Sequence, residues 1–380
     1  MIRRFLTAIG VCCISFIMLE GVCSALFAIH SLLAPKTGRT LAGASIRFDS
    51  ELGWSGVPNF YQPNYYAPGV GLRTNSSGFR GDREFTTKAP AGRVRVICSG
   101  DSQTFGDGVG NGHTWCQVLE SLNPRLETLN MAETGYGVDQ MYLSYKRSAA
   151  AMDHDVQLLA VITDNFRRMQ VDNMGGYGKP VLTLRNGEIA IDRTAVGRRS
   201  AVQHFWALKP NPLREFRSIT LASDLATSIV TRRNPLIDGP NPDQAATIGK
   251  VLDDLNALNR AKHSVLVVVY LPTKPADYDP GGPSEPWRKF MLAECSKRGV
   301  PFVDLIDGFQ KLPVTMKDGM YISPGATHYF AEVPGHFDDE GHYYVAQRVY
   351  SRLISMPELA PRLSSTMSSL MTRRNNLRAE

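Results

Sequence analysis

The sequence has few of the features that mark disulfide-rich, metal-binding or repetitive proteins. Its six cysteines fall into an N-terminal and a later group, Cys12, Cys13 and Cys23, and Cys98, Cys116 and Cys295. Three scattered thiols do not predict a disulfide framework, so Cys98 is expected to be a small buried hydrophobe. Metal sites have closely spaced ligands, a pattern absent from the late histidines His328, His336 and His342. No internal repeat is visible, and no cofactor is indicated.

The overall composition is that of a globular protein with little excess charge. Hydrophobic residues make up 43% and charged residues 21% of the 380 residues, enough for a substantial core. The formal net charge of +6 comes largely from arginine pairs that are expected to be solvated, and it permits an anionic membrane or an acidic glycan nearby. Nothing indicates nucleic-acid binding. One large domain with an insertion and two separate domains both fit this length.

The N-terminus carries an apolar segment that departs from this composition. Arg3 and Arg4 precede an uncharged run over 5–18, and after Glu20 the residues 22–33 are again largely apolar. Because no convincing Ala-x-Ala site or lipobox is present, residues 1–35 are predicted to be an uncleaved signal-anchor that spans a membrane once. The positive-inside rule then places the rest of the chain outside the cytoplasm, in the periplasm if the cell is Gram-negative. A cleaved signal peptide and an apolar helix packed on the domain are the alternatives.

The main chemical signal is a serine at the end of a predicted strand. The β-branched run over 94–99 leads directly into Gly100, Asp101 and Ser102. A glycine turn leaves the hydroxyl at the carboxyl end of the strand, where α/β enzymes place their chemistry. Ser102 is therefore the candidate nucleophile, and a purely structural turn serine is the alternative. Thr104 replaces the second glycine of Gly-x-Ser-x-Gly, which disfavours the nucleophile elbow of the α/β-hydrolases.

Three further segments follow in a suggestive order. Gly135 comes after a strand-like stretch, although an ordinary strand-to-helix glycine would look the same. Asn165 follows the apolar run 156–163, which is typical of a buried parallel strand. His336 stands on a predicted loop just ahead of the C-terminal helix.

This ordered set resembles the four blocks of the SGNH, or GDSL, hydrolase family. The first block is Gly-Asp-Ser-x-Thr-x-Gly at 100–106, and the resemblance covers residues 48–170 and 264–352. Motifs upstream of the serine are similar to those of a bacterial, membrane-tethered branch. The resemblance implies a three-layer α/β/α sandwich with a mainly parallel, flavodoxin-like sheet. It also implies an oxyanion hole made by the backbone N–H groups of Ser102 and Gly135 and by the amide of Asn165.

Two histidines compete for the role of general base. In the family a Val-Ala pair typically follows the catalytic histidine by nine and ten positions, and Val345 and Ala346 stand at that distance from His336. His342 would then fall in the first turn of the last helix, although it matches Asp-x-x-His together with Asp339. The resemblance therefore implies that His336 is the base.

The sequence departs from the family pattern at two positions. The family's acid lies three residues before the histidine, and Val333 occupies that position here. Glu332 is the nearest upstream acid and is the candidate third member of a triad, because it could fix the tautomer of the imidazole. A solvated loop glutamate, with a Ser-His dyad oriented by a backbone carbonyl, is the alternative. The order Asp164-Asn165 is also inverted relative to the usual Asn-Asp.

The remaining elements complete the predicted layout. Residues 36–355 form the predicted SGNH-like domain, with an insertion over about 171–262 that contains helices and a hairpin about Asn186-Gly187. Strands are predicted over 264–272 and 300–306, and a helix over 287–298. Residues 356–380 are predicted to be a weakly ordered tail.

These observations predict a serine esterase that forms an acyl-enzyme on Ser102. The expected substrate is an acyl, most simply acetyl, ester of extracytoplasmic carbohydrate, or another small ester. An O-acyltransferase uses the same intermediate with a sugar hydroxyl as acceptor. A second class of function is a degenerate SGNH domain that serves as a glycan-binding or assembly component of a membrane complex. The inverted Asp164-Asn165 order and the missing acid at 333 favour that alternative.

Overall fold

The chain forms two compact units, which we describe separately. The computed structural model describes residues 2–33, 45–174, 177–197, 218, 239–273, 277, 280–323 and 333–363. The first unit comprises residues 1–37 and 198–235, and the second comprises residues 38–197 and 236–380.

A single long helix, α1 (Ile2–Leu33), makes up the described part of the first unit together with Ser218. Its stretch Thr7–Leu26 has a mean hydropathy of 2.1 and is long and apolar enough to cross a membrane, a property that signal sequences share. Glu20 interrupts this stretch, and its Oε2 accepts hydrogen bonds from the Ser218 backbone N–H at 3.0 Å and from the Ser218 hydroxyl at 2.7 Å. These bonds offset part of the cost of a carboxylate in an apolar segment.

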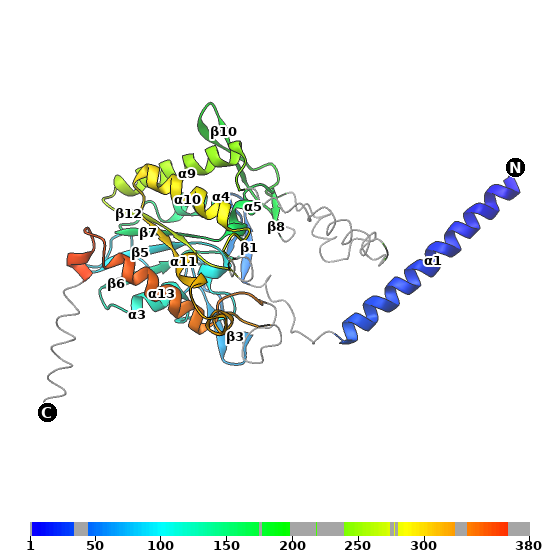
Figure 1. The fold of residues 1–380 in the computed structure, drawn as a ribbon, viewed down its shortest axis with the longest axis horizontal. Coiled ribbons are helices and arrows are strands. Elements are labelled where there is room, and N and C mark those ends of the chain that lie inside the picture. Colours follow the sequence, from blue (N-terminus) through cyan, green and yellow to red (C-terminus); the bar gives the residue numbers. More distant parts are fainter. Residues whose placement is uncertain are drawn as a thin grey trace. The chain divides into compact units, whose positions relative to one another are not determined.

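The second unit is built on a five-stranded sheet with the strand order β13-β12-β7-β5-β6 (Figure 1). All four strand pairs are parallel. The strands are β5 (Val94–Ser99), β6 (Leu126–Asn130), β7 (Val156–Val161), β12 (Val265–Tyr270) and β13 (Phe302–Asp304). The strand predictions at 94–99, 156–163, 264–272 and 300–306 are therefore confirmed.

Helices cover both faces of this sheet. Val96 of β5 packs in a buried cluster with Leu119 and Val349, whereas its neighbour Ile97 faces a cluster that contains Leu252. Because side chains alternate along a strand, successive residues of β5 contribute to opposite layers. One layer holds α3 (Trp115–Ser121) and α13 (Asp339–Leu353), and the other holds α4 (Val138–Ser148), α9 (Pro242–Arg260) and α10 (Glu285–Arg298) (Figure 1). The predicted three-layer α/β/α sandwich with a parallel sheet is confirmed.

Short hairpins and helices surround the sandwich. The hairpin of β10 (Val181–Arg185) and β11 (Glu188–Asp192) turns through Asn186 and Gly187, whose φ angles of +53° and +79° suit a two-residue hairpin turn. This prediction is confirmed. The other two-stranded pairs are β1 (Ile46–Asp49) with β2 (Gly53–Gly56), β3 (Tyr61–Ala67) with β4 (Val70–Arg73), and β8 (Asn173–Met174) with β9 (Tyr177–Gly178). The short helices are α2 (Ser102–Phe105), α5 (Thr163–Arg168), α11 (Leu305–Gln310) and α12 (Val314–Asp318).

A disulfide joins Cys98 of β5 to Cys116 of α3, so the expectation of free, scattered thiols is wrong for this pair. The two cysteines are 18 positions apart in sequence, but α3 packs directly on the sheet face to which Cys98 points. Spacing along the chain did not reveal this contact, because it depends on how the helix returns to the strand. Closing a loop of this size restricts the unfolded chain and stabilises a fold by about 3 kcal/mol.

The C-terminal segment is ordered further than the sequence predicts. Met356, Leu359 and Leu363 are 3%, 2% and 0% exposed and belong to the same core cluster as α3 and α13. Residues 356–363 are therefore part of the sandwich, which corrects the predicted start of a loose tail at 356. The rest of the predicted tail, 364–380, lies outside the described residues.

Candidate active site

The nucleophile candidate begins a short helix directly after the central strand β5. Asp101 caps α2 by accepting a hydrogen bond from the Gln103 backbone N–H at 3.0 Å, and Ser102 is the first helical residue. Gly100 is required at the turn because a Cβ there would lie 2.2 Å from Oγ1 of Thr104. The strand, the glycine turn and the cap together present the Ser102 hydroxyl at the carboxyl end of the sheet.

His336 faces this hydroxyl. Its Nε2 lies 2.8 Å from Oγ of Ser102, and its Nδ1 lies 3.1 Å from the carbonyl oxygen of Val333. A carbonyl can only accept, so Nδ1 carries the proton in this arrangement and Nε2 is free to accept from the serine. This is the tautomer that a general base needs. The backbone of Val333 thus contacts the ring where the family places an acid, and Glu332 lies outside the described residues.

Gln103, which the sequence analysis did not single out, holds the histidine loop on both sides of His336. Its Nε2 donates to the carbonyl of Gly335 at 3.1 Å, and its Oε1 accepts from the backbone N–H of Phe337 at 3.2 Å. Ile322 adds two backbone bonds to the same loop, to Gly335 and to His336. Gln103 is 4% exposed, so the amide is committed to this clamp. No sequence signal identifies it apart from its position next to Ser102.

Two backbone N–H groups near the serine are available as donors. Among the described residues, no acceptor is found for the N–H of Ser102 or of Gly135. Gly135 lies in the turn after β6 with a φ of +81°, which favours glycine. The turn is fastened to the serine segment by Glu133, whose N–H donates to Gly100, and by Thr134, whose hydroxyl donates to Asp107 at 2.7 Å.

Asn165 does not have a free amide. Its Nδ2 donates to Oδ2 of Asp101 at 2.9 Å and to the carbonyl of Tyr136 at 3.0 Å, and its Oδ1 accepts from the Ile162 N–H at 2.7 Å. A primary amide has two hydrogens, so both are engaged in this arrangement. The side chain is fully buried. The geometry therefore does not support the expected oxyanion role of Asn165 and assigns it a structural one at the junction of β5, α4 and α5.

The Asp164 carboxylate forms ion pairs with Arg167 and Arg168. Burial raises the pKa of its carboxyl, but the hydrogen bond from Arg167 and the charge of Arg168 outweigh burial and lower the pKa below its ordinary value. Arg168 also donates to Asp101 at 2.8 Å. The inverted Asp164-Asn165 order is thus accompanied by two arginines that neutralise the carboxylate.

The rival histidine is a core residue. His342 is 1% exposed, and its Nδ1 accepts from the Trp115 N–H at 3.1 Å, so it connects α13 to the start of α3. Burial and nearby positive charge lower its pKa to about 3, which keeps the ring neutral. It makes no hydrogen bond to Ser102. His328 lies outside the described residues, and within the described ranges no group of three His, Cys, Asp or Glu side chains could hold a metal ion.

Comparisons with known proteins find similarity at low sequence identity among solved structures. No protein-family model and no curated protein matches the sequence. Among solved structures, the chain is similar to a member of the lipolytic protein G-D-S-L family from Veillonella parvula DSM 2008, with 13% identity and a TM-score of 0.38 over 69% of this chain and 100% of that one. It is also similar to an acetylxylan esterase from Geobacillus stearothermophilus, in a catalytic mutant, with 11% identity and a TM-score of 0.39 over 70% and 96% of the two chains. The acetyl xylan esterase AlAXEase gives 11% identity and a TM-score of 0.38 over 69% and 100%.

Proposed function

We propose that this protein is a serine esterase that forms an acyl-enzyme on Ser102. The observation that carries the proposal is the 2.8 Å contact between Oγ of Ser102 and Nε2 of His336, with Nδ1 placed on the Val333 carbonyl. A nucleophile and a base within hydrogen-bond distance, with the base oriented by a third group, is the arrangement that activates a serine.

The geometry supports a two-step reaction. His336 takes the Ser102 proton as Oγ attacks the ester carbonyl, and the N–H groups of Ser102 and Gly135 are proposed to bind the negative oxygen. As the tetrahedral intermediate collapses, the C–O bond to the alcohol breaks, and His336 returns the proton to that alcohol. Water then attacks the acyl-enzyme with His336 as base, which releases a carboxylic acid and restores Ser102. A sugar hydroxyl in place of water would instead transfer the acyl group.

Two features support an extracytoplasmic location. The stretch Thr7–Leu26 is suited to a membrane anchor with Arg3 and Arg4 on the cytoplasmic side. The disulfide between Cys98 and Cys116 belongs to proteins of oxidising compartments rather than of the cytosol. We therefore propose that the enzyme acts on acyl esters, with acetyl the simplest, of envelope or secreted carbohydrate.

A fluorophosphonate probe tests the proposal directly, because it reacts covalently only with an activated serine. The full-length protein should be labelled and should hydrolyse a short-chain aryl ester, and Ser102→Ala should abolish both. An unlabelled but folded wild-type protein would favour the alternative of a degenerate, glycan-binding domain, for which the engaged amide of Asn165 is the specific observation. Product analysis on acetylated polysaccharide then separates hydrolysis from transfer.

A further inference from the structure

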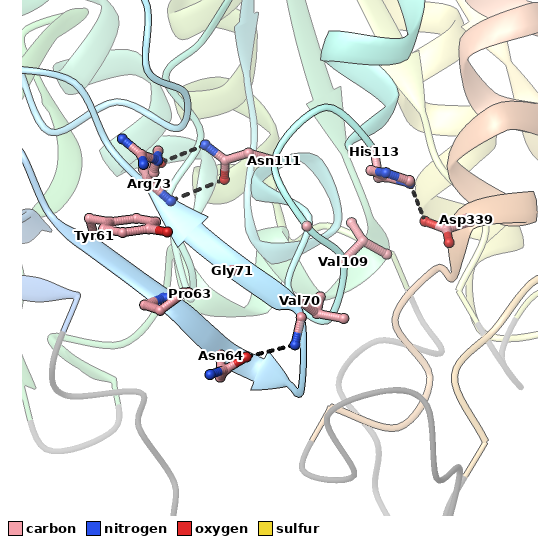
Figure 2. Close-up of a pocket in the computed structure, with 12 residues that line it drawn as sticks. Tyr61, Pro63, Asn64, Val70, Gly71, Arg73, Val109, Asn111, His113 and Asp339 are labelled. Carbon is pink, nitrogen blue, oxygen red and sulfur yellow. Dashed lines mark hydrogen bonds and ion pairs between the residues drawn. The ribbon is translucent and has the colours of Figure 1, made fainter.

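A groove of about 660 Å³ opens on the second unit (Figure 2). The hairpin of β3 and β4 forms one wall, the loop after α2 forms the floor, and Asp339 at the start of α13 closes the far side (Figure 2). The volume is in the range of sites that bind small ligands.

The groove shares its walls with the two segments that carry the serine and the histidine. The loop residues 109–113 follow directly on α2, which begins at Ser102. Asp339 is three positions after His336, and three residues of chain span at most about 11 Å. His113 joins the two segments because its Nδ1 lies 2.9 Å from Oδ1 of Asp339 (Figure 2). The groove is therefore bordered by the segments that follow Ser102 and His336 in the chain.

The lining combines apolar surface with a small number of polar groups, as ligand sites commonly do. Tyr61 is 54% exposed, and the guanidinium carbon of Arg73 lies 3.7 Å from the centroid of its ring (Figure 2). Asn111 fixes this wall with two 3.1 Å bonds to the backbone of Arg73. Val70, Val109 and Pro63 add apolar surface beside these polar groups.

The Tyr61–Arg73 pair offers the two kinds of contact that a sugar ring requires. The aromatic ring can pack on the C–H face of a pyranose, and the fork of the guanidinium can donate to neighbouring hydroxyl or carboxylate oxygens. Among the described residues, no carboxylate forms an ion pair with Arg73, so its donors are not neutralised by the protein.

We propose that this groove is a subsite for a sugar unit of an acylated oligosaccharide, with Tyr61 and Arg73 as its binding residues. The inference rests on the proposed esterase function, since it assumes that the substrate is attacked by Ser102. The inference adds that the enzyme recognises the carbohydrate part of its substrate. Tyr61 and Arg73, which are separate from the Ser102–His336 pair, would make that recognition.

The test compares oligosaccharide with small ester in the full-length protein. The value of kcat/KM would be measured for acetylated cello-oligosaccharide, for acetylated oligogalacturonide and for 4-nitrophenyl acetate. In Tyr61→Ala, kcat/KM for the oligosaccharide divided by kcat/KM for aryl acetate should fall about tenfold. A tenfold change corresponds to about 1.4 kcal/mol. Arg73→Met should lower the ratio for the acidic oligosaccharide more than for the neutral one if the bound oxygen is a carboxylate, and equally for both if it is a hydroxyl.

Phe48→Ala is the matched control. Phe48 is 57% exposed on β1, in another two-stranded hairpin, and does not line the groove. Its ratio should equal that of the wild type. An unchanged ratio in both Tyr61→Ala and Arg73→Met would overturn the inference, and so would a wild type that cleaves aryl acetate but neither oligosaccharide. If the wild-type protein did not cleave aryl acetate at all, the esterase function itself would be refuted.

Discussion

Asp101 and Ser102 are neighbours in the turn after β5, but their side chains enter networks of opposite character. The Asp101 carboxylate is fully buried and accepts from the Gln103 N–H, the Asn165 amide and Arg168. The Ser102 hydroxyl bonds to His336, which itself rests on a single backbone carbonyl.

The difference separates stability from reactivity. A buried polar group whose hydrogen bonds are all made is costly to disturb, because its partners would be left unpaired in the interior. A hydroxyl that shares one proton with a neutral imidazole can give that proton up without dismantling the fold. Substitutions at five positions, with their controls, would break or sharpen this comparison.

Ser102→Ala should have the largest effect. We expect kcat for an aryl ester to fall by about 10⁴-fold or more, because the nucleophile is lost, with the free energy of unfolding nearly unchanged. The matched change Asp101→Ala should instead lower that free energy by about 3 kcal/mol, since the Gln103 N–H, the Asn165 amide and Arg168 each lose a buried acceptor. Ester hydrolysis and urea denaturation measure the two quantities. Wild-type turnover in Ser102→Ala would end the esterase proposal.

His336→Ala should be nearly as damaging to kcat as the serine change. Combining the two should cost little more, because residues of one catalytic unit are not additive. His342→Ala should keep most of the activity but lower stability, since the Trp115 N–H loses its acceptor. If the two histidines ranked in the opposite order in turnover, the assignment of the base would be wrong.

Asn165→Ala distinguishes a structural amide from an oxyanion donor. Loss of its three hydrogen bonds should lower the free energy of unfolding by about 2–3 kcal/mol. An oxyanion donor would instead show a 100-fold to 1000-fold fall in kcat with KM and stability little changed. Asp164→Asn, which keeps the shape of the side chain, serves as the control. Kinetics and denaturation on the same preparations decide between the two roles.

Gln103→Ala should lower kcat about tenfold and leave KM unaltered, because the clamp positions His336 and does not contact substrate. Gln103→Glu should be at least as harmful, since a carboxylate cannot donate to the Gly335 carbonyl. A purely structural role would reduce the melting temperature without moving the pH profile of kcat/KM, whereas a misplaced base should shift that profile.

Glu133→Gln should change the pH dependence of stability and leave turnover nearly unaltered. Burial raises the pKa of its carboxyl from 4.5 to about 8, so the folded state favours the protonated form. The resulting stabilisation is complete below pH 4.5 and is lost as the pH rises through 8. Glu133→Gln removes this titration, so urea denaturation should show a smaller fall in stability from pH 5 to pH 8 than in the wild type. Parallel profiles for the two proteins would contradict the raised pKa.

The sequence predicted the elements whose signals are local. The apolar runs of β5, β7 and β12 and the Asn186-Gly187 hairpin were readable from periodicity and turn residues, because each pattern is contained within one element. The motifs also indicated which serine and which histidine lie together, and the structure brings these two within hydrogen-bond distance.

Features that depend on two distant segments were not predictable in the same way. The Gln103 clamp spans 232 positions to Gly335, and its residue type carries no signal by itself. The Cys98–Cys116 bond required the packing of α3 on the sheet. The hydrogen bonds from the Asn165 amide to Asp101 and Tyr136 were not predictable from the motif, because only the fold shows which acceptors lie near that amide.

The Cys98–Cys116 bond also makes the nucleophile segment a covalent ring. Ser102, Gln103 and Asp107 all lie inside the loop that this bond closes. A protease that cuts once between positions 98 and 116 would nick the backbone without releasing either piece. The two fragments would separate only on a reducing gel. A cut in the segment that bears Ser102 would thus leave both flanks joined by the disulfide.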